Sequence, residues 1–350
     1  MPSRRTIVLG AITAIGALLF LFPLTTGMLG KTQGVETLTG DLRASFEPDA
    51  LAQTRADMNT VQAMSDQLQA QTLPDLPNAL AMSPQQFQDY MGQNFPDVAS
   101  GTAQLNTILP KFQDLVTGLE TQAPNFRAAD QIPTSTLPST VAPFLFLVPG
   151  AALVLIAGGA LLFSRGRDGN RLPSAALAVS VVVGLVFVVA PLVLAVPAKA
   201  KAVDDLTAAF GPVFTDAGVA AVSSDMTVIT KMAEQLQTET VPALASALKM
   251  DPTQFQDFMG QNYPDVATGM GQLNEILPRF EALVTGMENN VDTFPLAASI
   301  PTANQDTTTL TWWFIVPGIA LILLGGIGLF TGSARLTNTG TPRERSLETV

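Results

Sequence analysis

Four carboxylates occur twice in the chain, 168 positions apart, and they are the side chains best suited to catalysis. The pairs are Asp57 and Asp225, Asp89 and Asp257, Asp97 and Asp265, and Glu120 and Glu288. Two neighbouring carboxylates can serve as general acid and base, as in a glycosidase. Asp97 and Asp265 have a simpler explanation, because each follows a proline at an expected helix start, where the helix dipole favours negative charge. We therefore expect no catalytic residue and no enzyme activity.

The chain contains no cysteine and no histidine. This composition excludes disulfides, thiol nucleophiles, Ser-His-Asp triads and zinc sites with Cys or His ligands. No segment has the spacing of a calcium-binding loop, so we expect no metal and no cofactor. The two long loops described below hold 10 basic and 26 acidic residues, which argues against binding of nucleic acid or of anionic lipid headgroups through these loops.

The clearest candidate for binding is a duplicated segment. Met82–Glu120 aligns with Met250–Glu288 without a gap, and 27 of the 39 positions are identical. The candidate binding residues are Phe87, Tyr90, Met91 and Phe95 in the first copy, and Phe255, Phe258, Met259 and Tyr263 in the second. Methionine and aromatic side chains together suit an adaptable hydrophobic groove for a lipid tail or a partner helix.

Core packing is the alternative explanation of the same segment, because an apolar stripe at steps of three and four is typical of a buried helix face. Gln88, Asp89, Gln93 and Asn94 are also identical in the second copy, and packing alone does not require this. The sequence leaves both interpretations open.

The duplication extends beyond this segment. The same offset relates Pro23 to Pro191, Pro74 to Pro242, and Pro149-Gly150 to Pro317-Gly318. The chain is therefore one structural unit written twice.

Four apolar stretches longer than 20 residues contain no charged residue. They are 6–27, 142–164, 174–197 and 311–332, and each is long enough to cross a bilayer as a helix. The first could be a cleaved signal, but it corresponds to the third stretch, which is internal, so we expect it to be retained. Pro149-Gly150 and Pro317-Gly318 are expected to be kinks or hinges, and glycine-rich faces such as Gly158-Gly159 favour close helix contact.

Basic residues predict the orientation. The N-terminus 1–5, the short loop 165–173 and the tail 333–350 hold 8 basic and 3 acidic residues. The positive-inside rule places these three segments in the cytoplasm. Loops 28–141 and 198–310 are then extracytoplasmic, and we expect a multi-pass protein of the plasma membrane.

Each long loop is predicted to be a helical bundle of three to five helices. Val98, Thr102, Leu105, Leu109, Phe112, Val116 and Leu119 follow an a/d pattern, and the second copy repeats it. Pro110 and Pro278 should kink or divide these helices. Ser83-Pro84 and Asp251-Pro252 are expected helix starts. The predicted fold is an all-α membrane protein with four transmembrane helices and two tandem-repeated extracytoplasmic helical-bundle domains.

These features favour a non-catalytic scaffold or accessory subunit of a bacterial-type cell envelope, which binds another envelope component through its duplicated loops. The expected partners are the lipid bilayer and an envelope or membrane protein. A factor that binds lipid or another hydrophobic small molecule through the repeated Phe/Tyr/Met segment is the alternative. A sensor that transmits bundle motion through the spans is a third class.

Overall fold

The computed structural model describes residues 4–163, 171–303 and 305–333, and these residues form helices and no strand. They divide into two compact units. The span unit comprises Met1–Glu36, Ala128–Asp205 and Leu296–Val350, and the loop unit comprises Thr37–Arg127 and Leu206–Pro295. Most of the predicted cytoplasmic loop 165–173, nearly all of the tail 333–350 and the first three residues lie outside the described residues.

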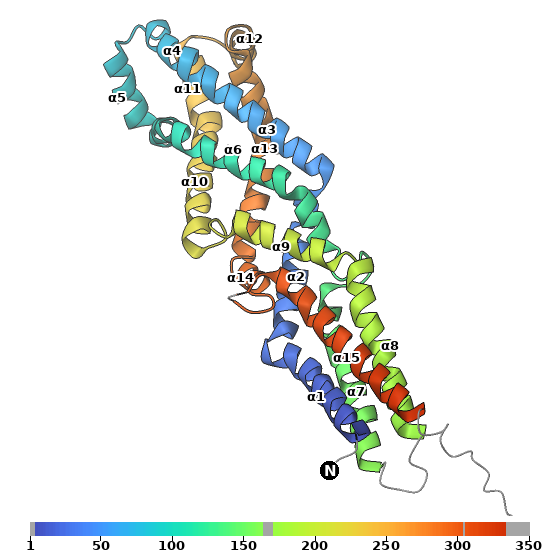
Figure 1. Cartoon of the computed structure of the whole chain (residues 1–350). Coiled ribbons are helices and arrows are strands. Elements are labelled where there is room, and N and C mark those ends of the chain that lie inside the picture. The colour runs from blue at the N-terminus through green and yellow to red at the C-terminus, as the bar shows by residue number, and fades with distance from the viewer. Residues whose placement is uncertain (1–3, 164–170, 304, 334–350) are drawn as a thin grey trace, which may run out of the picture. The chain divides into compact units, whose positions relative to one another are not determined.

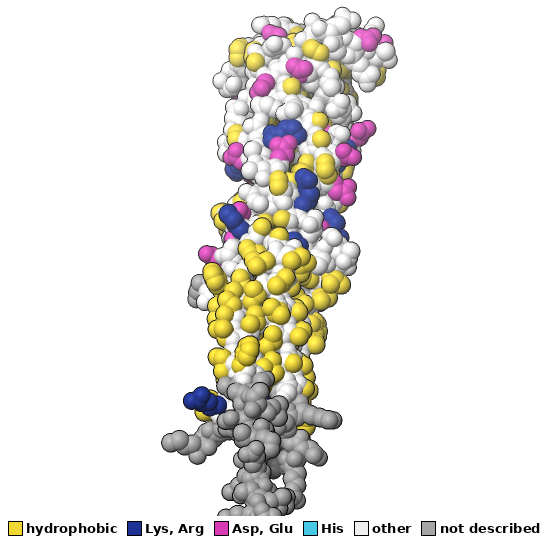
Figure 2. All heavy atoms as spheres, turned by 45° about the vertical axis from the view of Figure 1, so that its right-hand side comes forward, with side chains coloured by type: hydrophobic (Ala, Val, Ile, Leu, Met, Phe, Trp, Pro, Cys, Tyr) yellow, Lys and Arg dark blue, Asp and Glu magenta, His cyan; other side chains and the backbone are white. Residues whose placement is uncertain are grey.

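Four long helices dominate the span unit. They are α1 (Arg4–Thr25), α7 (Phe144–Phe163), α8 (Arg171–Val193) and α15 (Leu310–Ser333) (Figure 1). Each is long and apolar enough to cross a membrane, and hydrophobic side chains cover their surface in Figure 2. The four helices fit a multi-pass membrane protein, and their bounds lie within a few residues of the four apolar stretches seen in the sequence.

Glycines allow the span helices to approach closely in pairs. Helix α1 packs against α7, and α8 packs against α15. A Cβ atom added to Gly150 would lie 2.6 Å from the backbone nitrogen of Phe20, and one added to Gly184 would lie 2.6 Å from the carbonyl oxygen of Gly318. Helices α7 and α15 continue through Pro149 and Pro317. The glycines of the two Pro-Gly pairs therefore serve close helix contact within unbroken helices. Gly159 does not, contrary to the expectation for the Gly158-Gly159 pair, because no atom lies within 4 Å of its added Cβ.

The loop unit contains the same series of helices in both copies. In the first copy they are α3 (Pro48–Gln67), a π-helical turn (Leu68–Thr72), α4 (Leu73–Ala79), α5 (Pro84–Asn94) and α6 (Pro96–Asp130). In the second they are α10 (Asp216–Gln235), a π-helical turn (Leu236–Thr240), α11 (Val241–Ala247), α12 (Pro252–Asn262) and α13 (Pro264–Asn289), followed by α14 (Thr293–Ala298). Helices α2 (Met28–Leu42) and α9 (Val196–Phe210) each begin in the span unit and end in the loop unit.

Local sequence explains several helix boundaries. Ser83 and Asp251 each accept a hydrogen bond from the backbone N–H three residues later. The side chain of the glutamine at that position accepts a hydrogen bond from the backbone N–H of the capping residue. These capping boxes confirm the two expected helix starts. Helices α6 and α13 run through Pro110 and Pro278, so these prolines do not divide them.

The two copies exchange contacts within the loop unit. The side-chain Oε1 of Gln67, at the end of α3, accepts hydrogen bonds from the backbone N–H groups of Asp265 and Val266, at 2.8 and 3.1 Å. Gln235, the equivalent residue of α10, caps α6 in the same way, through the N–H groups of Asp97 and Val98 at 2.9 and 3.1 Å. Each glutamine satisfies free N–H groups at the helix start of the other copy.

This exchange bears on a question that the sequence leaves open. The sequence predicts a helical bundle for each long loop but not whether the two bundles contact each other, and in the structure residues of both loops share one unit and one hydrophobic core. Helix α3 of the first copy packs beside α13 of the second (Figure 1). A sequence pattern shows that a helix has an apolar face but does not show which helix covers it.

Candidate functional site

The structure places the eight candidate binding residues in or against the core of the loop unit. Phe87, Met91, Phe95, Phe255, Met259 and Tyr263 are buried there, and Tyr90 and Phe258 are partly buried and pack against them. The ring of Tyr90 meets that of Phe95 edge-on at a centroid distance of 5.7 Å, and Phe258 meets Tyr263 in the same way at 6.1 Å. The stripe therefore contributes to packing in both copies.

Two of these residues also line an open groove. Phe87 and Met91 of α5 form part of its wall, opposite residues of the π-helical turn, α4 and α6. The other lining residues are Gln69, Leu73, Pro74, Pro77, Pro84, Gln88, Ala99, Thr102 and Ala103. The groove has a volume of about 710 Å³. Phe87 and Met91 can therefore serve both core packing and the groove, because one face of each side chain lines the groove while the rest of the side chain packs in the core.

The sequence analysis did not include the wall formed by Leu73, Pro74 and Pro77. One signal was available, because Pro74 recurs as Pro242. The wall depends on the π-helical turn Leu68–Thr72, whose wider winding is frequent at functional sites and leads into the proline-rich helix α4. Gln88, one of the polar residues identical in both copies, lies at this groove with its side chain exposed.

The equivalent residues of the second copy line a cavity that is shared with the first copy. Phe255 and Met259, together with Met91, line an apolar cavity of about 50 Å³, whose walls come from both copies. Met270 of α13 lines the same cavity and stands at the position equivalent to Thr102. A longer apolar side chain thus replaces the threonine, and Gly271 replaces Ala103. The residues that line the groove described above all belong to the first copy.

Tyr263 adds a polar contact between the copies. Its hydroxyl donates a hydrogen bond to Oδ2 of Asp75, at 3.2 Å. Burial raises the pKa of Tyr263, and the negative charge of Asp75 raises this pKa further. The first copy lacks this bond, since Phe95 and Ala243 occupy the positions equivalent to Tyr263 and Asp75.

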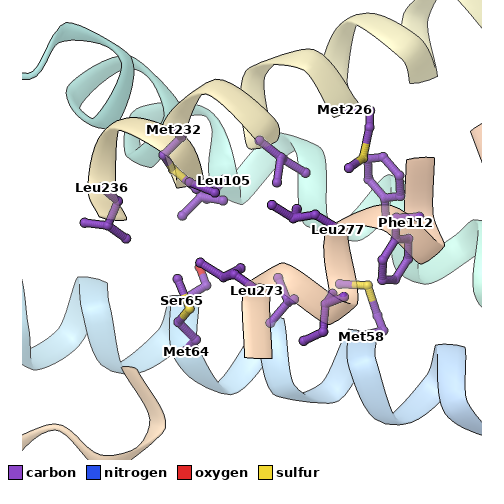
Figure 3. A pocket seen from close by; sticks show the side chains of 15 residues that line it. Met58, Met64, Ser65, Leu105, Phe112, Met226, Met232, Leu236, Leu273 and Leu277 are labelled. Carbon is purple, nitrogen blue, oxygen red and sulfur yellow. The ribbon is translucent and has the colours of Figure 1, made fainter. Parts of the chain in front are cut away.

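A methionine-rich cavity lies in the centre of the loop unit (Figure 3). Its volume is about 40 Å³, and its lining includes the equivalent pairs Met58 and Met226, and Met64 and Met232. Phe112 and Phe280, also equivalent residues, meet there edge-to-face at a centroid distance of 5.8 Å. Contact between equivalent residues places this cavity where the two copies meet. The cavity is far below the few hundred cubic ångströms typical of small-molecule sites.

The repeated carboxylates mainly serve structural contacts. Asp57 accepts two hydrogen bonds from Arg279, at 2.5 and 2.9 Å, and Asp225 pairs with Lys111 at 2.7 Å. Lys111 and Arg279 are equivalent positions, so each pair joins one copy to the other. Within the described residues, no group of three or more acidic side chains could hold a metal ion.

Glu120 has a partner in its own copy. It forms an ion pair with Arg55, and the side chains of both residues are about one-third exposed. The hydrogen bond from Arg55 lowers the pKa of Glu120, and the charge of the guanidinium acts in the same direction. Asp89, on the opposite side of α5 from the stripe, is exposed and accepts a hydrogen bond from Gln85 at 3.2 Å. Asp57, Asp225, Glu120 and Asp89 each have a side-chain partner within the loop unit.

Comparisons of the chain with protein-family models, curated proteins and solved structures found no match. The groove beside Phe87 and Met91 therefore stands on its geometry alone.

Proposed function

We propose that this chain is a non-catalytic scaffold or accessory subunit in the membrane of a bacterial-type cell envelope. In this proposal its termini lie in the cytoplasm and its two long loops lie outside. The loop unit, built from both copies of the repeat, binds an apolar segment of another envelope protein. The observation that carries the proposal is the groove of about 710 Å³ walled by Phe87, Met91 and prolines of α4.

The chemistry of the groove supports a polypeptide partner. Its wall combines Leu73, Phe87 and Met91 with three prolines, and Gln69 and Gln88 supply amide groups that could orient a backbone. Methionine adapts to different apolar surfaces, and prolines keep the wall rigid at little entropic cost. None of the residues that line the groove is charged, so it offers mainly apolar contact.

Site-specific photocrosslinking tests the proposal. A photoreactive amino acid replaces Ala103, an exposed groove residue, in the full-length protein in native membranes. Gln104, the next residue of α6, is exposed but does not line the groove, and it serves as the matched control position. We expect a discrete polypeptide adduct from position 103 and none from position 104. Adding Phe87→Ala to the position-103 variant should weaken the adduct, because it removes part of the wall.

The alternative function is binding of a lipid or another hydrophobic small molecule in the same groove. The volume of the groove lies within the range of small-molecule sites, which favours this second candidate. Mass spectrometry of the position-103 adduct distinguishes the two, since a lipid adds a small fixed mass to the chain. Equal labelling at positions 103 and 104 would contradict both functions for this groove.

The orientation requires a separate test, which the absence of native cysteine makes simple. Gln93 and Gln261 are equivalent exposed residues of the two loops. A membrane-impermeant maleimide should label Gln93→Cys and Gln261→Cys in intact cells. It should label Asp168→Cys only after lysis. The reverse pattern would overturn the proposed topology without affecting the groove.

A further inference from the structure

A further cavity lies in the span unit, at those ends of the four spans from which the long loops begin and end. Its volume is about 70 Å³. The beginnings of α2 and α9 line it, together with Ile132 and Ile300. The starts of the second and fourth candidate spans, Ser139–Phe163 and Thr307–Phe330, complete the wall. Helix α1 ends at Thr25 and α8 at Val193, just before the lining residues Met28 and Val196. In the proposed topology the cavity is therefore expected near the level where a bilayer changes from hydrocarbon to headgroups.

Both copies build this cavity in the same way. Seven equivalent pairs line it: Met28 and Val196, Thr32 and Ala200, Val35 and Val203, Ile132 and Ile300, Ser139 and Thr307, Ala142 and Leu310, and Phe146 and Phe314. The rings of Phe146 and Phe314 contact each other with a centroid distance of 4.2 Å. The cavity therefore lies where the two copies meet in the span unit.

The wall exposes only apolar atoms, although it includes hydroxyl-bearing residues. Thr32 Oγ1 donates to the carbonyl of Met28 at 2.9 Å, and Ser139 Oγ donates to Glu36 at 2.7 Å. Thr307 Oγ1 donates to the carbonyl of Ile300 at 3.2 Å. Because the polar groups are satisfied by the protein, water would find no partner inside, and a dry apolar cavity accepts hydrocarbon.

Two lysines hold the connectors beside the cavity. Lys31 Nζ donates to the carbonyls of Ser299 and Pro301, at 2.8 and 2.9 Å. Lys199, whose side chain also lines the cavity, donates to the carbonyls of Gln131 and Pro133, at 2.7 and 3.2 Å. Burial lowers the pKa of both lysines.

Each ammonium group has three N–H donors, of which the carbonyls take two. In the described part of the chain neither lysine forms an ion pair with a carboxylate. An anion near these groups would accept the remaining donors and offset their charge.

We infer that this cavity receives part of an acyl chain of an anionic membrane phospholipid, whose phosphate lies near Lys199, the lysine that lines the cavity at the membrane end of an otherwise acidic loop. The cavity has room for about five water-sized spheres, which corresponds to a short stretch of hydrocarbon. This site is independent of the groove beside Phe87 in the loop unit. Its failure would leave the proposed function unchanged.

Native mass spectrometry of the full-length protein tests the inference. The protein is delipidated in mild detergent and mixed with phosphatidylglycerol or with phosphatidylcholine of the same acyl chains. We expect one phosphatidylglycerol to be retained more strongly than phosphatidylcholine. Ala200→Leu, which fills the cavity, should reduce this retention about tenfold, as the loss of roughly two buried methylenes predicts. Ala198→Leu, at an exposed position of the same helix, should leave it unchanged.

Photolabelling of the unmodified protein avoids dependence on a variant that could misfold. Phosphatidylglycerol with a diazirine in its acyl chain should label peptides that contain Ile132 and Ile300. Labelling confined to exposed span residues such as Leu155 and Leu162 would show ordinary surrounding lipid and would overturn the inference. The inference would also be overturned if the wild-type protein retained both lipids equally, or if folded Ala200→Leu protein retained phosphatidylglycerol as strongly as the wild type.

Discussion

Arg279 of α13 holds the buried carboxylate of Asp57 in α3 through two hydrogen bonds, at 2.5 and 2.9 Å. The equivalent pair, Lys111 and Asp225, makes one contact at 2.7 Å and is more exposed. The two ion pairs cross between the copies in opposite directions. They provide a matched comparison within one molecule, because the two pairs join equivalent positions of the repeat, while the cation, the burial and the number of hydrogen bonds differ.

Arg279→Met should therefore destabilise the protein much more than Lys111→Met. The first substitution leaves Asp57, whose side chain is 2% exposed, without its cation, and we expect a loss of about 3 kcal/mol in the free energy of unfolding. The second breaks a pair whose lysine is half exposed, and we expect less than about 1 kcal/mol. Urea unfolding in detergent, followed by circular dichroism, measures both. Equal losses would show that burial of Asp57 does not govern this contact.

The exchange of contacts predicts how the two halves of the chain behave when separated. Fragments 1–168 and 169–350, expressed together, should associate into a complex with the stability of a folded protein. Each fragment alone should remain aggregated or unfolded, because Gln67 and Gln235 cap helices of the other half and the core of the loop unit contains both halves. An affinity tag on one fragment and size-exclusion chromatography test this. A folded single fragment of monomeric size would contradict the shared core.

Gly150 should be sensitive to a single added methyl group. In Gly150→Ala the new Cβ would lie 2.6 Å from the backbone nitrogen of Phe20, so that α1 must move, and we expect a loss of about 1–3 kcal/mol. Gly159→Ala in the same helix is the control, since no atom lies within 4 Å of its added Cβ. That variant should be neutral or gain up to about 1 kcal/mol from helix propensity. Thermal unfolding in detergent compares them, and equal midpoints would refute close packing at Gly150.

The ion pair of Glu120 with Arg55 predicts a small pH dependence of stability. The pKa of Glu120 is lowered in the folded state, so its contribution is present above the unfolded pKa of about 4.3 and is lost as the pH falls through the lower folded value. Because both side chains are about one-third exposed, solvent screening limits this contribution to about 0.5 kcal/mol. Glu120→Gln should be less stable than wild type at pH 6, and this difference should shrink as the pH falls to 3.

Glu288 provides the control for the ion pair, because Ser223 stands at the position equivalent to Arg55. Glu288→Gln removes a carboxylate that lacks this arginine, so it should change the stability at pH 6 less than Glu120→Gln does. If the effect of Glu120→Gln persists undiminished at pH 3, its origin is not the charge of the carboxylate.

The sequence alone predicted the features that depend on neighbouring residues. Length and apolar composition identified the four spans, and a capping residue before a proline identified the starts of α5 and α12. The helical periodicity of Phe87, Met91 and their equivalents correctly indicated an apolar face. These signals are visible in sequence because a helix and its caps are formed by residues a few positions apart.

The tertiary structure decided what lies against each apolar face. It joined the two loops into one unit, paired Asp57 with Arg279, and set Pro74 and Pro77 opposite Phe87 to form the groove. It also placed Lys31 beside Pro301, 270 residues away. Such contacts depend on how separate helices dock, and an apolar stripe can be covered equally well by several partners of similar shape. The periodic pattern therefore fixed which residues face inward, and only the packed molecule determined what they meet there.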